Sequence, residues 1–251
     1  KGKKYWIIGA SEGLGRELSI QLSNLGVKLI ISARNETRLN ELSSLTKAKV
    51  LALDVLNIDA INQASKSVGI IDGIIYVAGD YTPLNSTTWN VEEVDKMIAV
   101  NFTGAAKVLG FIVPKFLKQN NGHIVMIGSL SGFRGLPNAI GYGASKAAMM
   151  HLAENIKADL YKTPIKIQLI NPGFIKTRLT EKNNFKMPFI MSVEDAAKRV
   201  IFAMNPPLGE RAKGTQVVAH PEEPVVVDAR VADCSAESKK HHAAFLVMDG
   251  R

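Results

Sequence analysis

Short apolar runs alternate with amphipathic stretches along most of the chain. Between the apolar runs, hydrophobic residues recur with helical spacing, as in Leu14, Leu18, Leu22 and Leu25. The apolar runs that predict strands are 4–10, 27–33, 49–53, 70–77, 124–127 and 165–170. Strands that alternate with helices favour right-handed crossovers and a parallel sheet covered on both faces. The pattern therefore predicts a doubly wound α/β fold with three layers, α/β/α.

The helical patterns lie at 14–25, 35–45, 58–68, 91–119 and 142–161. A last helix is expected after Ser192, where a capping hydroxyl precedes acidic residues in the first turn. Pro114 should kink or divide the longest helix. The run 70–77 reads as a strand buried on both faces.

The composition fits a globular α/β protein. Of the 251 residues, 46% are hydrophobic and 22% are charged. No apolar run reaches about 18 residues, so we expect no integral membrane segment, and the first apolar run is too short for a signal peptide. The single Cys234 excludes an internal disulfide framework and indicates a reducing compartment, so a cytoplasmic location is expected.

The net charge of +8 raises the question of a nucleic-acid or membrane-surface partner. Lysine and arginine are spread along the chain, however, and no run of five or more occurs. We therefore expect no nucleic-acid partner and only a modest attraction for ligands that carry phosphate. No zinc spacing, Walker loop or EF-hand loop is visible, so no metal site is expected.

A glycine loop follows the first strand. Gly9, Gly13 and Gly15 form the pattern G-x-x-x-G-x-G, which also holds Ser11 and Leu14, and a helix starts there. Glycines permit a tight turn and close approach of the backbone, and the N–H groups of the helix N-terminus can bind a pyrophosphate. The order of strand, glycine loop and helix predicts a dinucleotide site of the Rossmann type.

The second strand ends at Arg34, where the adenosine ribose should lie. A guanidinium there suits a 2′-phosphate, so NADP(H) is preferred and NAD(H) stays possible. Glu12, in the glycine loop, lends no such help. In the alternative interpretation, Arg34 is only the exposed start of the next helix.

Other candidate residues also follow predicted strand ends. Asp54, with Val55, could bind the adenine amino group, although an Asp there is more often a plain cap. The remaining candidates at strand ends are Ala78, Gly79, Ser129, Pro172, Gly173 and Thr177. Ligands of such sheets bind at the carboxyl ends of the strands. This convergence favours an enzyme.

Tyr142 and Lys146 lie four residues apart on a predicted helix and so share one face. A positive charge beside a phenol lowers its pKa, which suits proton transfer to an alkoxide near neutral pH. Ser129 can offer a hydroxyl to the same carbonyl oxygen. The bland alternative is a surface helix face, but of the five tyrosines only Tyr142 has lysine four residues later.

These residues resemble the short-chain dehydrogenase/reductase family from about residue 4 to 204. The resemblance rests on the glycine loop, Asp54-Val55, Ala78-Gly79, Asn101, Ser129, Tyr142-x-x-x-Lys146 and Pro172-Gly173 with Thr177. It implies a catalytic tetrad in which Tyr142 is the acid–base and Ser129 orients the carbonyl. It further implies that Lys146 lowers the pKa of the tyrosine and holds the nicotinamide ribose, while Asn101 anchors a relay water. Thr177 would lie near the nicotinamide carboxamide.

Two positions depart from the family pattern. Ile8 replaces the usual threonine before the first glycine, and Tyr76-Val77 replaces the usual pair of asparagines before Ala78-Gly79. The first change removes a hydroxyl from the turn, and the second removes two side chains that brace the adjacent strand and the cofactor. Both bear on cofactor affinity.

The last 46 residues differ in composition from the rest. Isoleucine and asparagine are frequent up to Asn205 and absent from 206–251, which contain the only cysteine and three of the five histidines. We therefore predict one NADP-binding and catalytic domain over 1–205 and an atypical C-terminal segment over 206–251. Within that segment, 225–227 and 245–248 could be strands, the latter the seventh of the sheet. Its Cys and His residues are too sparse for a metal site.

The leading hypothesis is an NADP-dependent carbonyl reductase that reduces a hydrophobic ketone or aldehyde. The apolar loop 179–191 and Phe174 favour such a substrate, although apolar residues in a lid often only pack it shut. The alternatives are a non-catalytic NADP-sensing regulator on the same fold and a nucleic-acid or membrane-surface protein. The resemblance also implies pairing through helices 91–119 and 142–161, giving a homodimer or homotetramer.

Overall fold

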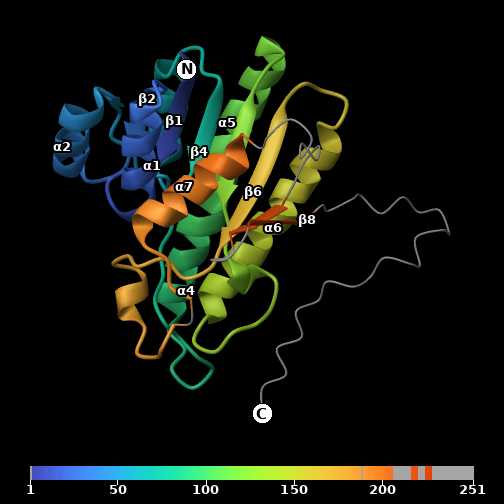
Figure 1. The fold of residues 1–251 in the computed structure, drawn as a ribbon. Coiled ribbons are helices and arrows are strands. Elements are labelled where there is room, and N and C mark those ends of the chain that lie inside the picture. The colour runs from blue at the N-terminus through green and yellow to red at the C-terminus, as the bar shows by residue number, and fades with distance from the viewer. Residues whose placement is uncertain (1, 188, 206–215, 220–223, 228–251) are drawn as a thin grey trace.

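A computed structural model gives the fold of residues 2–187, 189–205, 216–219 and 224–227. Its centre is one sheet with the strand order β3-β2-β1-β4-β5-β6-β7-β8 (Figure 1). Every pairing is parallel except that of β7 with β8. The strands are β1 Lys4–Ile8, β2 Lys28–Ser32, β3 Lys49–Val50, β4 Gly73–Tyr76, β5 His123–Ile127, β6 Lys166–Pro172, β7 Gln216–Ala219 and β8 Pro224–Val227.

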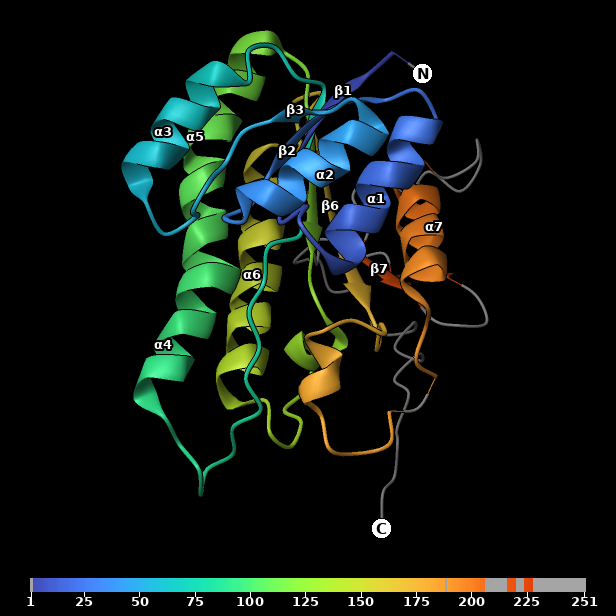
Figure 2. The same cartoon turned by 90° about the vertical axis from the view of Figure 1, so that its left-hand side faces the viewer.

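Helices cover both faces of this sheet. In Figure 2, α3, α5 and α6 lie on one side of the strands, and α1, α2 and α7 lie on the other. The α-helices are α1 Gly13–Asn24, α2 Glu36–Thr46, α3 Ile58–Ser67, α4 Val91–Ile98, α5 Gly104–Gln119, α6 Ile140–Asp159 and α7 Val193–Met204. The predicted doubly wound fold with three layers is therefore confirmed.

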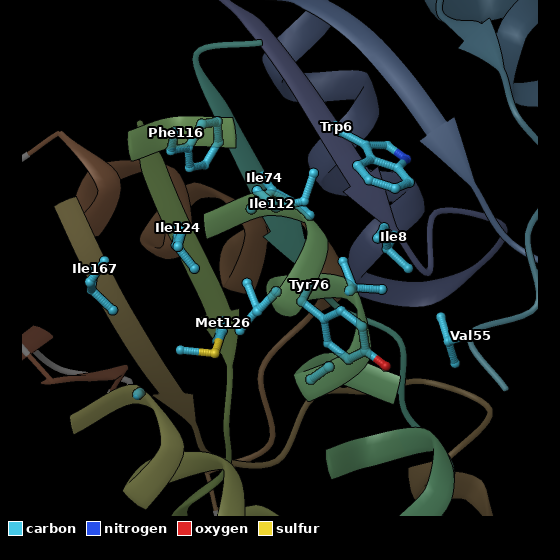
Figure 3. Close-up of a cluster of buried hydrophobic side chains, with 14 of the residues drawn as sticks. Trp6, Ile8, Val55, Ile74, Tyr76, Ile112, Phe116, Ile124, Met126 and Ile167 are labelled. Carbon is cyan, nitrogen blue, oxygen red and sulfur yellow. The ribbon is translucent and has the colours of Figure 1, made fainter. Parts of the chain in front are cut away.

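Alternation along the strands sends side chains into two separate cores. Trp6 and Ile8 of β1 join the cluster under α3, α5 and α6, part of which Figure 3 shows. Tyr5 and Ile7 of the same strand join the cluster under α1, α2 and α7. Successive side chains of a strand point to opposite faces, so a strand buried on both faces reads as one continuous apolar run.

Several details of the prediction are wrong. The strand predicted at 49–53 is only Lys49–Val50. The strand predicted at 70–77 starts only at Gly73, and the Ile70 side chain is 79% exposed. Asp72 explains the late start, because its carboxylate accepts a hydrogen bond from the Lys4 backbone N–H in the turn before the strand. Pro114 lies inside α5 and so does not divide the long helix, while a kink there stays a prediction. The long helix is interrupted by a π-turn, η1 Ala99–Thr103, between α4 and α5.

Helix α5 continues through Pro114 because its apolar face is anchored in the core. Val108, Ile112 and Phe116 are fully buried against the sheet. The continuous helical stretch Val91–Gln119 is the one described segment that is long and apolar enough to span a membrane. Its buried side chains belong to the core of the α/β fold, so we read it as a core helix.

Beyond Asn205 the structure describes only β7 and β8. The predicted strand at 225–227 is confirmed as part of β8. The seventh strand of the sheet is Gln216–Ala219, which pairs with β6, and not 245–248 as predicted. The predicted strand 245–248, Cys234 and the last three histidines lie outside the described residues, and the boundary at residue 205 stays a prediction.

Candidate functional site

The carboxyl ends of the parallel strands border a cavity of about 870 Å³. This volume lies within the range of ligand pockets, roughly 300–1,000 Å³. The predicted site residues that line it are Gly9, Ser11, Gly13, Leu14, Gly15, Arg34, Asp54, Val55, Ala78, Gly79, Ser129, Tyr142, Lys146, Pro172, Gly173 and Thr177. Of all the predicted site residues, Asn101 alone is not among the lining residues. The structure thus brings the other candidates together around one space.

The glycine loop forms a floor on which the backbone lies close to the cavity. Gly9 has φ of 95°, and a Cβ added there would lie 2.4 Å from the Ala78 backbone nitrogen. A Cβ at Gly15 would lie 2.1 Å from the Gly9 carbonyl oxygen. Side chains at these two positions would displace the backbone, so the loop fits a ligand whose phosphates must approach N–H groups closely.

The hydroxyl missing at position 8 is not needed to close this turn. The backbone N–H groups of Gly9 and Ala10 both donate to the Ser32 carbonyl oxygen, at 2.8 and 3.1 Å. Ile8 itself is buried in the core. The departure from the family pattern is therefore accommodated by the backbone, and its effect on cofactor affinity stays a prediction.

The end of the cavity beside the carboxyl end of β2 is rich in arginine. Arg34 and Arg38 both line it and are exposed. The Glu12 carboxylate, at the N-cap of α1, forms salt bridges with Arg38 and with Arg178 of the loop after β6. Glu12 was expected to give no help to a 2′-phosphate, and this stays a prediction, but the two salt bridges that it forms at the cavity were not foreseen. The sequence offered one signal for Arg38, its position four residues after Arg34.

Asp54 combines the two roles that the sequence left open. Its carboxylate accepts a hydrogen bond from the Leu56 backbone N–H at 3.0 Å, which stabilises the turn after β3. Asp54 and Val55 also line the cavity. The hydrogen bond to the Leu56 N–H therefore does not take Asp54 away from the cavity.

Lys146 lies deep in the wall of the cavity beside Tyr142. Its ammonium is 5.6 Å from the centre of the Tyr142 ring and donates to the Ile127 carbonyl oxygen at 2.9 Å. Because the side chain is buried, the pKa of Lys146 falls to about 8. The ammonium therefore loses its charge above about pH 8 when no anionic ligand is bound.

Burial is also the largest influence on Tyr142. We expected Lys146 to lower the pKa of the phenol, but burial raises it above its usual range, and a hydrogen bond with Ser129 only partly opposes this. The side chain of Ser129 is in turn fixed by Ser131, whose hydroxyl donates to it at 3.0 Å. Tyr142 is thus a protonated phenol at neutral pH in this structure.

Asn101 lies behind the cavity, in the π-turn η1. Its Oδ1 accepts from the Asp80 backbone N–H at 2.7 Å, and its Nδ2 donates to the Asp80 carbonyl oxygen and to Ser145 Oγ, both at 2.9 Å. Ser145 also donates to the Tyr142 carbonyl oxygen. The Asn101 side chain therefore clamps the segment after β4 to the helix that carries Tyr142.

Two buried polar residues of the site were missed in the sequence. Ser145 is one, although it immediately precedes Lys146. Asn171, at the end of β6, accepts a hydrogen bond from the Ser129 backbone N–H at 3.0 Å. A Cβ at Gly128 would lie 1.9 Å from Asn171 Oδ1, so Gly128 leaves the space for this contact. The only signal for Asn171 was its position directly before Pro172-Gly173.

Tyr81 was missed as well, and it connects the loop after β6 to Tyr142. Its ring packs edge-on against the Tyr142 ring, with centroids 5.0 Å apart. Its hydroxyl donates to Asn183 Oδ1 at 2.6 Å, and Lys182 donates to its carbonyl oxygen. The loop after β6 is thus attached, through Asn183 and Lys182, directly to the neighbour of Tyr142.

A family model described as short chain dehydrogenase matches residues 3–187. Among curated proteins, the chain is 35% identical over 213 residues to an uncharacterised oxidoreductase of Staphylococcus epidermidis, covering 82% of this chain and 93% of that protein. It is also 35% identical over 201 residues to an uncharacterised oxidoreductase of Myxococcus xanthus, covering 76% of this chain and 79% of that protein.

Solved structures show the same fold at lower identity. Serine dehydrogenase in its closed form, complexed with NADP+, superposes with a TM-score of 0.76 at 24% identity, covering 84% of this chain and 92% of that one. An actinorhodin polyketide ketoreductase with NADPH gives a TM-score of 0.77 at 20% identity, covering 88% and 97%.

Proposed function

The chain belongs to the short-chain dehydrogenase family, an oxidoreductase family, and we propose that it is an NADP(H)-dependent reductase of hydrophobic ketones or aldehydes. The observation that carries the proposal is the position of Tyr142, Lys146 and Ser129 in the wall of the cavity whose floor is the glycine loop. A dinucleotide on that floor would bring its nicotinamide toward the phenol. Hydride transfer and proton transfer could then act on the same carbonyl.

The preference for NADP(H) rests on charge at the adenosine end. Arg34 and Arg38 offer two guanidinium groups, which form strong hydrogen bonds to phosphate. Glu12 neutralises part of this charge while it holds Arg38. The two related structures named above contain NADP+ or NADPH, which agrees with this preference.

Proton transfer is assigned to Tyr142. The bound cofactor supplies the hydride that adds to the carbonyl carbon. Tyr142 gives its phenolic proton to the carbonyl oxygen, so the ketone becomes an alcohol and Tyr142 becomes a tyrosinate. The Ser129 hydroxyl donates a hydrogen bond to the same oxygen and orients it. Lys146 stabilises the tyrosinate that forms, because its ammonium lies 5.6 Å from the ring.

The substrate class is inferred from apolar side chains beside the strand ends. Leu130 and Phe133 follow β5, and each is more than a third exposed. Leu130 reaches the loop after β6, because its Cδ1 would lie 3.7 Å from a Cβ added at Gly173. In that loop, Phe174 packs edge-on against Phe185, which is 44% exposed. A hydrophobic carbonyl compound would bury this surface on binding.

The remaining parts of the proposal concern assembly and location. We propose a homodimer or homotetramer formed through the α4–α5 helix and α6, and a cytoplasmic location. Light scattering of the purified protein tests the first, and fractionation of cells that produce it tests the second. An NADP-sensing regulator on the same fold stays the alternative function, and it predicts tight NADPH binding with no turnover of any carbonyl compound.

A matched panel of ketones tests the function. Purified protein is mixed with NADPH and with pairs of ketones that differ in an apolar chain or an aromatic ring, and loss of NADPH absorbance is followed. We expect turnover, with kcat/KM rising by roughly tenfold for each two buried methylene groups, at about 0.8 kcal/mol per group. Preference for polar carbonyl compounds would contradict the substrate class. Binding of NADPH without turnover across the panel would favour the regulator.

A further inference from the structure

Tyr76 occupies the position at the end of β4 where the family pattern has asparagine, and the function proposed above does not use it. The side chain is fully buried, and its hydroxyl donates to the Val100 carbonyl oxygen at 2.7 Å. Burial raises the pKa of this phenol well above its usual range, so it stays a hydrogen-bond donor at every working pH. In Figure 3 the ring and hydroxyl of Tyr76 project from the strand toward the side on which Val55 lies.

The acceptor of this hydrogen bond belongs to the π-turn Ala99–Thr103. Such wide turns are rare inside helices, occur often at functional sites, and depend on tertiary contacts for their stability. Asn101 follows Val100 directly and is clamped to Asp80 through both atoms of its amide. The turn is therefore held from two sides, by Tyr76 at the Val100 carbonyl and by Asp80 at the Asn101 side chain.

Gly104 provides the space for the Tyr76 hydroxyl. A Cβ added at Gly104 would lie 2.8 Å from that hydroxyl and 2.9 Å from Val55 Cγ2. Glycine within a helical stretch costs about 0.5–1 kcal/mol relative to alanine, so a packing reason is expected for it. Val55 itself lines the cavity. The contact between Tyr76 and the π-turn is thus built into the wall beside the cofactor site.

We propose that Tyr76 is a positioning residue that fixes the π-turn and, through it, holds Asn101 and the Asp80 backbone in register with Tyr142. The catalytic part of this inference rests on the reductase function proposed above. Tyr76 does not line the cavity and acts only through the Val100 carbonyl. Its hydrogen bond to the Val100 carbonyl oxygen would then replace the support that the family's asparagines give to the adjacent strand.

A second buried tyrosine of the same sheet separates this role from simple burial of a hydroxyl. Tyr5 of β1 is also buried, and its hydroxyl is hydrogen-bonded to His123 Nδ1 at 2.7 Å. Both Tyr76→Phe and Tyr5→Phe remove one buried hydrogen bond and leave the ring. A purely structural role predicts that both variants lose stability and that neither loses kcat.

The test combines hydrogen exchange with kinetics. In Tyr76→Phe, amide exchange of residues 99–104 should become faster, and kcat should fall by roughly tenfold or more, the effect of a small displacement of catalytic groups. The NADPH dissociation constant should change less than about twofold. Tyr5→Phe should keep both the exchange of 99–104 and kcat. In an Asn101→Ala background, the kcat penalty of Tyr76→Phe should disappear, because both changes act through the same turn.

Two outcomes would overturn the inference while leaving the reductase function intact. One is wild-type exchange of 99–104 in Tyr76→Phe, and the other is a kcat penalty that persists in full without the Asn101 side chain. Absence of turnover in the wild-type protein would instead contradict the reductase function, and with it the catalytic part of this inference. The exchange measurement still decides whether Tyr76 fixes the turn, because it requires no activity.

Discussion

The two ends of the sheet treat buried polar groups differently. At the amino end, three side chains are hydrogen-bonded in series. The Tyr5 hydroxyl lies 2.7 Å from His123 Nδ1, and His123 Nε2 lies 2.6 Å from Gln168 Oε1. Gln168 Nε2 then donates to the Ala203 carbonyl oxygen. At the carboxyl end, Lys146 is buried without a carboxylate partner among the described residues, and Asn171 Nδ2 has no hydrogen-bond partner among them. Gln119 Oε1, near the amino end, also lacks a hydrogen-bond partner among the described residues, so the clear difference is the buried ammonium of Lys146 beside the cavity.

Backbone conformations with positive φ occur at both ends of the sheet, but the π-turn lies only at the carboxyl end among the described residues. The carboxyl end holds Gly9 with φ of 95° and the π-turn that carries Asn101. At the amino end, Gly26 and Asn120 also have positive φ, in turns before strands that begin in regular register. Strain and unpaired polar groups persist where a function requires them. The π-turn and the buried ammonium of Lys146 therefore distinguish the carboxyl end of the sheet, and the following changes test this distinction.

The largest expected effect comes from Tyr142→Phe at the carboxyl end. Removing the hydroxyl eliminates the proton donor, so turnover should fall on the order of 10²–10⁴-fold. NADPH binding should survive, because the glycine loop is untouched. Steady-state kinetics and a fluorescence titration of NADPH measure the two effects. Tyr161→Phe, at a side chain 71% exposed, is the control and should behave as wild type. Near-normal turnover in Tyr142→Phe would refute the assigned role.

Gly9→Ala should damage the floor of the cavity. The new Cβ would lie 2.4 Å from the Ala78 nitrogen in a backbone conformation that costs an L-residue about 1–2 kcal/mol. The free energy of unfolding should fall by at least ~2 kcal/mol, and NADPH binding should be lost. The matched control is Gly110→Ala, where no atom lies within 4 Å of the added Cβ. Chemical denaturation and NADPH titration compare the two, and equal behaviour would show that the close approach is unimportant.

His123 sets a pH dependence of stability at the amino end. Burial lowers the pKa of His123 from 6.5 to about 4, so the folded state holds it neutral. Between these values the unfolded chain binds the extra proton more readily. Stability is therefore complete above about pH 6.5 and should fall by on the order of 2–3 kcal/mol as the pH drops toward 4.

Urea denaturation at pH 7 and pH 5 measures this loss, and His123→Gln should remove most of it. The carboxylates that titrate over the same range are shared by both proteins, so the difference between them isolates His123. An unchanged pH dependence in His123→Gln would place the acid sensitivity elsewhere.

The smallest expected effect comes from Tyr81→Phe. This change keeps the ring against Tyr142 and removes the hydrogen bond to Asn183. One hydrogen bond contributes about 0.5–1.5 kcal/mol, so KM for the ketone should rise a few-fold while kcat stays close to wild type. Asn183→Leu should have the same effect, and the double variant should add nothing to either. Additive effects would mean that the loop is not held through this contact.

Much of the fold and most of the candidate site were readable in the sequence, for a physical reason. Parallel strands are buried on both faces, so their apolar runs stand out, and the residues that follow them converge at one edge. Arg34, Asp54 and Ser129 were found in this way, whereas Tyr142 and Lys146 were found from their spacing on a helix. The π-turn, the Glu12 salt bridges and the role of Asn171 were not, because each depends on contacts between segments far apart in the chain.

The residue types alone also led to a wrong prediction for the pKa of Tyr142. From the nearby Lys146 we predicted a lowered pKa for Tyr142, yet burial of the phenol raises this pKa and is the larger effect. The depth of a side chain in the wall of a cavity is a tertiary property, and a spacing of four residues does not report it. Similarly, the replacement of asparagine by Tyr76 suggested that support for the adjacent strand was lost. In the folded chain, however, the Tyr76 hydroxyl donates a hydrogen bond to the Val100 carbonyl oxygen.

The most direct test of the account is a titration of the purified protein with NADPH and with NADH, followed by nicotinamide fluorescence, in the wild type and in Arg34→Ala. The account predicts that the wild type binds NADPH at least tenfold more tightly than NADH, and that Arg34→Ala loses most of this difference by weakening NADPH alone. Failure of the wild type to bind either nucleotide, or equal affinity for both, would contradict the proposal that this cavity is an NADP(H) site.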